Sequence, residues 1–508
     1  MSIGEGGERR REDHRVVIIG AGVGGSVAAF RLAEAGVDNV VLERGRRWPI
    51  TPAADTFPRM MAPDGRSLWL APPSVPAERR PVGPRRRIGA VAARAWPRST
   101  GLLDVTLHRH LTIVCGAGVG GGTLVYAGML PQPRPGPFYR VFPQQLDYGE
   151  LDEIYYPRAR RRLGSSAFPQ DLLSHPRYRS NRIWGNALGA SGLTAEDAHN
   201  AYDFDIIRSE LSGAAPPAAT IGQYEFTGCN SGAKLSVDRT YLARAEATGR
   251  TTVRPLHRVV SLEQDRKGRY RLLVERMISG GAVVERISMT CDRLIMAAGG
   301  VHTPRLLVAA RDTGALPGLN EHVGAQWGTN ADQILFLRTR SAPAGGPQAS
   351  PPAFMVRSED DTVLLAHAGL PLRSGSRLMW CLGVGLSDRF GRWTYSPGSG
   401  RVRLDWARGS DATAHDDAVR LLRRIAPHLP SGAKVVDPLA RHPLTAHPLG
   451  GAALGRATDL YGRLHGHPGL YCLDAALMPG STAAANPALT IAAIAERCLD
   501  AVIGDFIT

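Results

Sequence analysis

Residues 15–43 read RVVIIGAGVGGSVAAFRLAEAGVDNVVLE, and this stretch decides the fold of the chain. The β-branched run 15–19 precedes a cluster of glycines, and residues 26–35 then place apolar side chains at helical spacing. Gly36 ends that helix, and the apolar run 39–42 predicts a second strand. The stretch therefore predicts a compact βαβ unit, which is the building block of a Rossmann-like domain.

The glycine cluster matches the pattern GxGxxG at Gly20, Gly22 and Gly25, directly between the predicted strand and the predicted helix. A phosphate-binding turn needs a tight bend, a backbone open to pyrophosphate and a third glycine where helix and strand pack. Glu43 follows Gly25 by eighteen residues, at the end of the second strand. Its carboxylate would accept hydrogen bonds from ribose hydroxyls and repel a 2′-phosphate. The pattern favours FAD or NAD over NADP and does not distinguish the first two.

Length and hydrophobicity bound the class of protein. With 508 residues, 43% of them hydrophobic, the chain can bury a large core and predicts two or more domains. The strongest apolar run, 378–386, has nine residues, whereas a membrane-spanning helix needs about 20. The first fifteen residues are polar and charged and lack the apolar core of a secretion signal. We therefore expect a cytoplasmic protein without integral membrane association.

Cysteine and charge patterns exclude further classes. The six cysteines lie far apart without a CxxC pair, which argues against a disulfide framework and against a structural metal. The formal net charge is +15, yet the arginines are spread along the whole chain. A nucleic-acid-binding protein would concentrate basic residues on one face with interleaved aromatic residues. We expect no metal and no nucleic-acid partner.

The rest of the chain alternates between loop-rich and strand-rich segments. Residues 46–100 are rich in Pro, Arg, Ser and Gly and predict an excursion of loops. A buried strand at 111–114 leads into a second glycine run, and residues 323–439 read mostly as strands with a helix near 416–425. The remaining predicted elements are antiparallel strands at 250–265, 270–276 and 282–290, strands at 293–298 and 469–473, and a final helix at 487–503.

Four further segments identify a known family. They are CGAGVGGGTLVYAGML (115–130), RLIMAAGGVHTPRLLVAARDTGALPGL (293–319), AHPLGGAALGRATDLYGRLHGHPGLYCLDAALMPG (446–480) and ANPALTIAAIAERCLDAVI (485–503). These segments resemble the glucose-methanol-choline (GMC) oxidoreductases, and within them the bacterial cholesterol oxidases that bind FAD non-covalently. The resemblance runs from about residue 14 to 505 and implies that the dinucleotide is FAD.

The resemblance implies an α/β architecture with two domains. The first is a Rossmann-like FAD-binding domain, and the second is a substrate domain built on a mostly antiparallel sheet with lid loops. The implied FAD-binding segments are 1–50, 102–165, 228–322 and 441–508. The implied substrate-binding segments are 51–101, 166–227 and 323–440.

The resemblance also implies a set of cofactor-binding residues. The second glycine run would lie along the flavin ring and ribityl chain, where a backbone without side chains can approach closely. The N-terminus of the final helix would face the flavin and stabilise negative charge on it. The implied cofactor-binding residues are Gly20, Gly22, Gly25, Glu43, Gly116, Gly121, Gly122, Met129, Val259, Ala298, Asp474, Asn486 and Pro487.

His447 and Asn486 are the catalytic pair that the resemblance implies. In this family a histidine followed by PLGG and a later His or Asn meet above flavin N5. An imidazole can accept a hydroxyl proton near neutral pH, and a carboxamide can donate to the same alcohol oxygen. We therefore expect hydride transfer from a secondary alcohol to flavin N5, with oxygen or another electron acceptor.

Several positions depart from the steroid oxidases in the family. The glutamate that isomerises their product falls at about Ser376 or Arg377, so we expect no isomerase activity. Ala446 replaces an aromatic residue, and Tyr126 replaces an asparagine near the flavin and leaves no histidine for covalent attachment. We expect non-covalent FAD and a remodelled pocket for a bulky, largely apolar ring compound other than cholesterol.

The residues alone leave several substrates and functions possible. Arginines between 79 and 87 in the excursion could favour an acidic or carrier-tethered substrate, or could belong to a solvated loop. The same catalytic pair would serve a dehydrogenase with a non-oxygen acceptor, a desaturase or a reductase. A flavin-bound protein without catalysis, acting as a binding module through its basic surface, is the remaining class.

Overall fold

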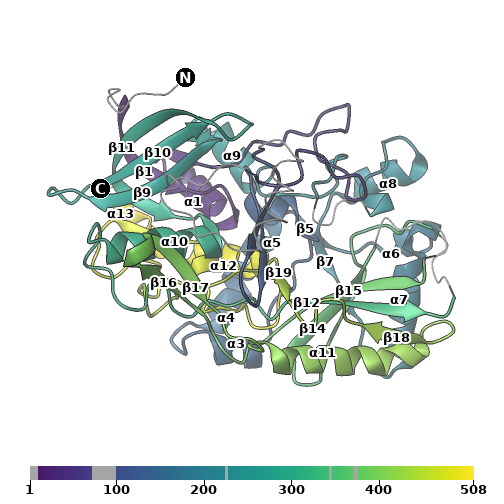
Figure 1. Ribbon diagram of the computed structural model, residues 1–508. Helices are drawn as coiled ribbons and strands as arrows, with labels where there is room; N and C mark the ends of the chain where they lie inside the picture. Colours follow the sequence, from purple (N-terminus) through teal and green to yellow (C-terminus); the bar gives the residue numbers. More distant parts are fainter. Residues whose placement is uncertain (1–9, 71–98, 223–226, 342–345, 370–375, 508) are drawn as a thin grey trace.

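The computed structural model describes residues 10–70, 99–222, 227–341, 346–369 and 376–507. Two sheets dominate the described chain, with a central helix, α12 (Pro487–Val502), next to the first of them (Figure 1). The arginines between 79 and 87 lie outside the described residues.

The first sheet contains the predicted βαβ unit. Its buried strands are β-branched and apolar, and β1 pairs in parallel with β2 on one side and β11 on the other. Helix α1 (Val23–Glu34) follows β1 and packs beside α9 (Tyr241–Ala247) and α12. The order is β8 (Thr251–Arg254), β2 (Asn39–Leu42), β1 (Arg10–Ile19), β11 (Val283–Met296), β10 (Tyr270–Met277) and β9 (His257–Gln264), with β20 (Leu470–Cys472) beside β11.

The antiparallel part of this sheet differs from the predicted strands in two places. The strand predicted at 250–265 is two strands, β8 and β9, because the chain turns at Leu256, whose φ is +60°. The strands predicted at 282–290 and 293–298 are one long strand, β11. Its N-terminal half pairs with β10, whereas its C-terminal half pairs with β20 inside the core.

The second sheet is antiparallel throughout. One of its faces packs against helices, and the other contributes residues to the cleft described below. Leu335, Leu365 and Cys381 point to a core covered by α7 (Arg179–Ala190) and α11 (Ala412–Ile425). Alternate residues, such as Leu364 and Ala366, point to the opposite face, as the two-residue period of a strand requires. The order is β18 (Ala433–Val436), β12 (Gln333–Thr339), β15 (Leu378–Gly385), β14 (Val363–Ala368), β13 (Phe354–Arg357) and β6 (Glu196–Asp197).

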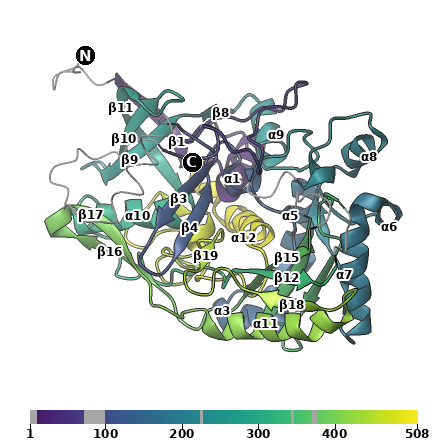
Figure 2. The same cartoon turned by 45° about the vertical axis from the view of Figure 1, so that its right-hand side comes forward.

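One hairpin departs from the predicted domain boundaries. The strands β16 (Arg392–Ser396) and β17 (Arg401–Asp405) lie in a segment predicted to belong to the substrate domain. They pack instead against α10 (Gly299–Asp312), and Trp393 and Trp406 belong to the core of the first sheet. Figure 2 shows this hairpin beside α10 and away from the second sheet.

A small sheet brings the second glycine run close to the segment that contains His447. Strand β4 (Thr112–Gly116) pairs with β3 (Leu103–Leu107) on one side. On the other side it runs parallel to β19 (Leu444–Thr445), with Thr445 opposite Ile113. Because parallel strands end at the same edge, the residues that follow β4 and β19 emerge together.

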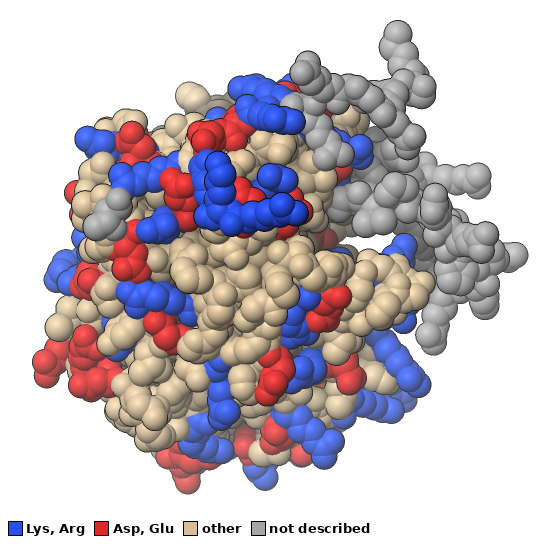
Figure 3. All heavy atoms as spheres, turned by 90° about the vertical axis from the view of Figure 1, so that its left-hand side faces the viewer, with Lys and Arg blue, Asp and Glu red and all other residues tan. Residues whose placement is uncertain are grey.

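Further helices and short strands connect these sheets. The helices are α3 (Pro135–Val141), α4 (Tyr148–Glu150), α5 (Tyr156–Leu163), α6 (Gln170–Leu173), α8 (Phe204–Ser212) and α13 (Gly504–Ile507), and β5 (Ser165–Ala167) pairs with β7 (His199–Ala201). On the face in Figure 3, basic and acidic side chains are interspersed around an uncharged centre.

Candidate active site

The first glycine turn is shaped by close backbone packing. A Cβ atom on Gly20 would lie 2.1 Å from the carbonyl oxygen of Ala297, and one on Gly24 would lie 1.7 Å from that of Leu473. A Cβ atom on Gly25 would lie 2.0 Å from the carbonyl oxygen of Gly20. Any side chain at these positions would separate α1 from the sheet, which is the packing role predicted for Gly25.

Beside this turn the backbone forms an open cradle. A Cβ atom on Gly22 would have its nearest neighbour, the Cα atom of Gly121, 4.0 Å away. Cβ atoms on Gly122 and Gly299 would meet nothing within 4 Å. Helix α1 begins at the cradle, so its free N–H groups and the positive end of its dipole favour an anion there. The cradle fits the pyrophosphate of a dinucleotide.

Glu43 lies at the end of β2, next to this cradle. Its carboxylate accepts hydrogen bonds from the backbone N–H groups of Ala21, at 3.2 Å, and Gly45, at 2.7 Å. Burial raises the pKa of Glu43. The Glu43 side chain therefore holds the backbone of the glycine turn in place. It also lines the cleft, where it could accept hydrogen bonds from ribose hydroxyls.

Asp474 links two segments below the cleft. It accepts from the backbone N–H of Gly299 at 2.6 Å and from the hydroxyl of Thr303 at 2.7 Å. Its second oxygen accepts from the backbone N–H of Ala476 at 2.8 Å, and burial raises the pKa of the carboxyl group. Asp474 lines the cleft as expected, but both of its oxygens already hold the protein backbone.

Arg44, Asp104 and His302 form a charged cluster beside the cleft that no motif in the sequence predicts. Arg44 donates to Asp104 at 2.8 Å, and Asp104 also lies 3.2 Å from Nε2 of His302. Burial lowers the pKa of His302 to about 4, so its ring is neutral at pH 7. These residues join the ends of β2, β3 and α10 around the cleft, although they are distant along the chain.

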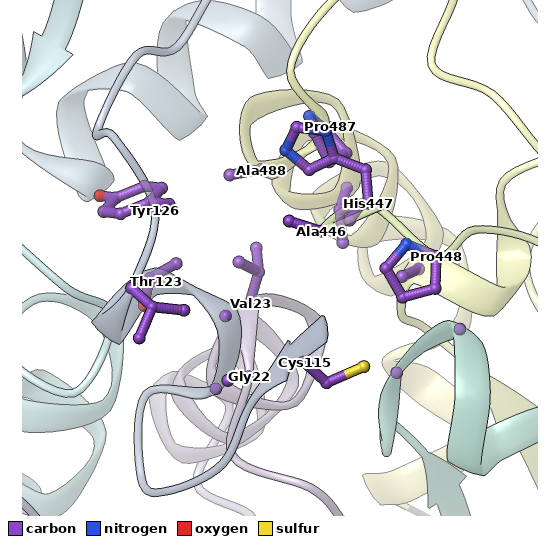
Figure 4. A pocket seen from close by; sticks show the side chains of 18 of the residues that line it. Gly22, Val23, Cys115, Thr123, Tyr126, Ala446, His447, Pro448, Pro487 and Ala488 are labelled. Atoms are coloured by element: carbon purple, nitrogen blue, oxygen red, sulfur yellow. The ribbon is translucent and has the colours of Figure 1, made fainter. Parts of the chain in front are cut away.

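The cleft lies between the two sheets. Its empty space is about 1760 Å³ with its mouth included, and it has a continuous wall from the glycine turn to the second sheet. Figure 4 shows His447, Pro487 and Ala488 on one side of it, opposite Tyr126 and Thr123, with Gly22 and Val23 between them. The predicted residues that line the cleft are Gly20, Gly22, Glu43, Gly116, Gly121, Gly122, Met129, Ala298, His447, Asp474, Asn486 and Pro487.

Gly25 and Val259 are predicted cofactor-binding residues that do not line this cleft, and Gly25 packs helix against strand instead. Val259 lies further away. It lies within β9, and its half-buried side chain packs against the core of the first sheet. The nearest link from this region to the cleft is the backbone N–H of His257, which donates to the carbonyl oxygen of Glu43 at 2.8 Å. The cofactor-binding role predicted for Val259 stays a prediction.

His447 is held at the cleft by Asp332, a residue that sequence reasoning missed. The Nδ1 atom of His447 lies 2.5 Å from a carboxylate oxygen of Asp332. The other oxygen accepts from the backbone N–H groups of Ala446, at 2.8 Å, and His447, at 3.1 Å, and from the hydroxyl of Thr445 at 2.8 Å. This carboxylate fixes the ring orientation and assigns the proton to Nδ1, which leaves Nε2 as an acceptor.

Asn486 presents its amide to the same cleft. It is the residue that precedes helix α12, and its side chain does not cap that helix. Among the described residues its amide makes no hydrogen bond, and it is partly exposed to the cleft. Pro487 occupies the first helical position, where a missing N–H costs nothing.

The wall facing these residues is apolar. The second sheet contributes Ile334, Leu364, Ala366 and Leu382 to it. Tyr126 adds its ring, while its hydroxyl donates to the carbonyl oxygen of Leu235 at 2.6 Å and burial raises its pKa well above the usual range. Ala446, which replaces an aromatic residue, leaves the space beside His447 open.

Together the fold and the cleft define a dinucleotide-binding oxidoreductase. A Rossmann-like sheet carries the cradle for pyrophosphate, and an antiparallel sheet closes the opposite side near the half-buried imidazole of His447. The residues present fit FAD, because Gly116, Gly121 and Gly122 line the cleft without side chains and a Cβ atom on Gly122 would meet nothing within 4 Å.

Comparisons with known proteins show which families the chain is similar to. Residues 398–495 match the profile of GMC oxidoreductases, and residues 18–55 match that of the NAD(P)-binding Rossmann-like domain. A cholesterol oxidase of Mycobacterium tuberculosis is 27% identical over 96% of this chain and 90% of its own length. The paromamine 6′-oxidase of Streptomyces fradiae is 25% identical over 62% of this chain and 53% of its own.

A solved structure shows the same fold. The crystal structure of pyridoxine 4-oxidase from Mesorbium loti superposes with a TM-score of 0.64 at 16% identity, covering 96% of this chain and 99% of that one. The chain is thus similar to the GMC oxidoreductases, and the matches indicate an oxidoreductase acting on CH–OH groups. Among the described residues, no helix has the length and apolarity needed to cross a bilayer.

Proposed function

We propose that the protein oxidises a secondary alcohol on a bulky, largely apolar ring compound, using non-covalently bound FAD. Bound FAD supplies the hydride acceptor, its N5 atom, when the alcohol carbon is oxidised. The observation that carries the proposal is that His447 and Asn486 line one cleft, to which the second sheet contributes apolar side chains. The mycobacterial cholesterol oxidase relative supports an apolar alcohol as substrate.

His447 takes the hydroxyl proton in this proposal. Its Nδ1–H donates to Asp332 at 2.5 Å, so the free lone pair is at Nε2. A proton arriving at Nε2 creates an imidazolium, which the neighbouring carboxylate stabilises. Asn486 donates its amide N–H to the alcohol oxygen and so orients the carbon–hydrogen bond.

The polar groups of the cleft favour a neutral substrate. Among the described lining residues the carboxylates are Glu43, Asp332 and Asp474, and each already accepts hydrogen bonds from the protein. No described carboxylate is thus available to isomerise a steroid product. Ser376 and Arg377, at the expected position of that group, are not among the lining residues. These observations support an oxidation without isomerisation.

Non-covalent binding is supported by the chemistry of the lining. Tyr126, at the position where some relatives attach flavin through a histidine, is hydrogen-bonded through its hydroxyl. Cys115 also lines the cleft, but burial raises the pKa of its thiol to about 12, so a thiolate is not available for attachment. Acid precipitation of the holoprotein should release the flavin into solution.

The proposal is tested by anaerobic mixing of the holoenzyme with neutral cyclic secondary alcohols, from cyclohexanol to 3β-hydroxysteroids. Bleaching of the flavin band near ~450 nm is expected, and admission of air then distinguishes an oxidase from a dehydrogenase. The variant His447→Ala should lower the reduction rate by about 10²- to 10⁴-fold. His465→Ala, which changes an exposed histidine, is the matched control. Equal rates for His447→Ala and the wild type, or no bleaching by any alcohol, would reject the proposal.

A further inference from the structure

Two unusual turns lie directly before the active-site residues. Asn330 and Ala331, with φ of +57° and +47°, precede Asp332, and Ala483 and Ala484, with φ of +57° and +56°, come shortly before Asn486. Residues other than glycine rarely adopt this left-handed conformation, which is strained and persists only where the surroundings enforce it. Both turns are therefore held in place by other contacts.

The side chain of Asn330 supplies those contacts for both turns. Its Nδ2 donates to the carbonyl oxygen of Ala485 at 2.8 Å. Its Oδ1 accepts from the backbone N–H of Thr482 at 2.9 Å and from the hydroxyl of Ser481 at 3.1 Å. Asn330 is fully buried, with 0% of its surface exposed. The direction of the amide follows from these partners, since one is a fixed donor and another a fixed acceptor.

Each end of this linkage is close to a proposed catalytic group. Asp332, two residues after Asn330, binds both the ring and the backbone N–H of His447. Ala485, which accepts from Asn330, is adjacent to Asn486 in the chain. One buried amide thus connects the turn that holds the imidazole to the turn that presents the carboxamide.

We infer that Asn330 is a positioning residue that sets the separation between the His447 imidazole and the Asn486 amide. This inference rests on the proposed function of that pair. A displacement of about 1 Å between two reacting groups lowers rates by on the order of 10²-fold, whereas binding by the apolar wall is unaffected. The effect therefore falls on the rate of the chemical step and not on substrate affinity.

The variant Asn330→Asp tests the linkage because it keeps the acceptor and replaces the donor by an oxygen facing the Ala485 carbonyl. With the alcohol found above, the limiting rate of flavin reduction should fall about 10- to 100-fold, and the half-saturating concentration should stay within about threefold. Acidification should bring the rate closer to that of the wild type at the same pH, because the introduced carboxyl group can donate once it is protonated.

Two further variants separate positioning from general destabilisation. Asn181→Asp is the matched control, since Asn181 is also 0% exposed and also accepts from a backbone N–H, that of Ala353 at 2.9 Å. It should lower the melting temperature without changing the reduction rate per bound flavin. Thr482→Val removes the hydroxyl that donates to Ala485 at 2.7 Å and tests the same linkage if Asn330→Asp does not fold.

A readout without substrate keeps this inference independent of the proposed function. The Nδ1 proton of His447 should give a low-field proton NMR signal, because it lies in a short hydrogen bond to Asp332. Asn330→Asp should shift or remove that signal, and Asn181→Asp should not. Wild-type values of both rate and signal in Asn330→Asp, or equal losses in Asn181→Asp, would overturn the inference. Failure of every alcohol to bleach wild-type flavin would reject only the proposed function.

Discussion

At the scale of single residues, Asp332 shows how one carboxylate organises a site. It accepts four hydrogen bonds, from Thr445, from the backbone of Ala446 and His447, and from the His447 ring. Hydrogen bonds to a charged acceptor are stronger than neutral ones, so this arrangement fixes the imidazole with little freedom to rotate. The aspartate acts through His447 and is therefore a positioning residue.

A second carboxyl group, that of Asp411, lies close enough to Asp332 for their charges to interact. It accepts a hydrogen bond from the hydroxyl of Thr329 at 2.6 Å. Burial raises the pKa of Asp411 to about 6, and the nearby negative charges of Asp332 and Asp388 contribute. The folded protein therefore binds more protons at Asp411 than the unfolded chain does between pH 3.8, the ordinary pKa, and about 6.

Asp411→Asn should remove this pH dependence. For a carboxyl group with a raised pKa, the free energy of unfolding falls as the pH rises through that window, and the loss is complete above it. The variant should be more stable than the wild type by about 1–2 kcal/mol at pH 8 and nearly equal to it at pH 4. Urea denaturation at both pH values measures this, with Asp405→Asn, an exposed change, as the control. A constant difference across pH would contradict the prediction.

At the scale of elements, the open glycine cradle makes a prediction about the cofactor. Gly122→Leu would place a side chain in the cleft, because nothing lies within 4 Å of a Cβ atom there. The purified variant should be folded by circular dichroism but should lack flavin absorbance near ~450 nm. Gly136→Leu is the control, since a Cβ atom on this exposed residue of α3 also meets nothing within 4 Å. Full flavin content in Gly122→Leu would show that the cofactor lies elsewhere.

Helix α12 is anchored by a buried carboxylate. Glu496 is fully buried and accepts from Arg31 and Arg162, at 2.7 Å each, and from the hydroxyl of Tyr241 at 2.9 Å. These partners connect α12 to α1, α5 and α9. The same helix begins at Pro487, directly after Asn486, so its anchor also holds one end of the site.

Glu496→Gln should therefore be strongly destabilising. The substitution removes the negative charge that Arg31 and Arg162 share in a buried network. The free energy of unfolding should therefore fall by about 3 kcal/mol. Glu359→Gln removes an exposed partner of Arg424 and should cost less than about 1 kcal/mol. Equilibrium denaturation of both variants measures the difference. Equal small losses would show that the arginines find other partners.

At the scale of the whole molecule, the cleft lies where two separately built sheets meet. Its lining comes from distant parts of the chain, from Gly20 to Ile491. A ligand that binds only the folded protein stabilises it by RT ln(1 + [L]/Kd), or about 2.7 kcal/mol at a concentration of 100 Kd. Removal of FAD should accordingly lower the melting temperature, and added FAD should raise it in a concentration-dependent way. A melting temperature independent of FAD would contradict the site.

Local spacing explains what could be predicted from the chain alone. The βαβ unit, the glycine turn and Glu43 depend on residues within about thirty positions, whose strand and helix periods can be read directly. Strand limits were less predictable, because the break at Leu256 and the continuity of β11 depend on pairing partners. The hairpin β16–β17 was assigned to the substrate domain but packs against α10, and this too depends on contacts between distant segments.

The amino-acid sequence by itself determined the nucleotide-binding unit and the order of the motifs, and through the family resemblance it predicted the candidate pair His447 and Asn486. Only the tertiary structure decided that Asp332 holds the imidazole, that Arg44, Asp104 and His302 join the rim, and that Asn330 links both sides. The physical reason is distance along the chain. Asp332 lies 115 residues from His447 and Asn330 lies 155 residues from Ala485, and packing of the two sheets alone brings such residues within hydrogen-bond reach.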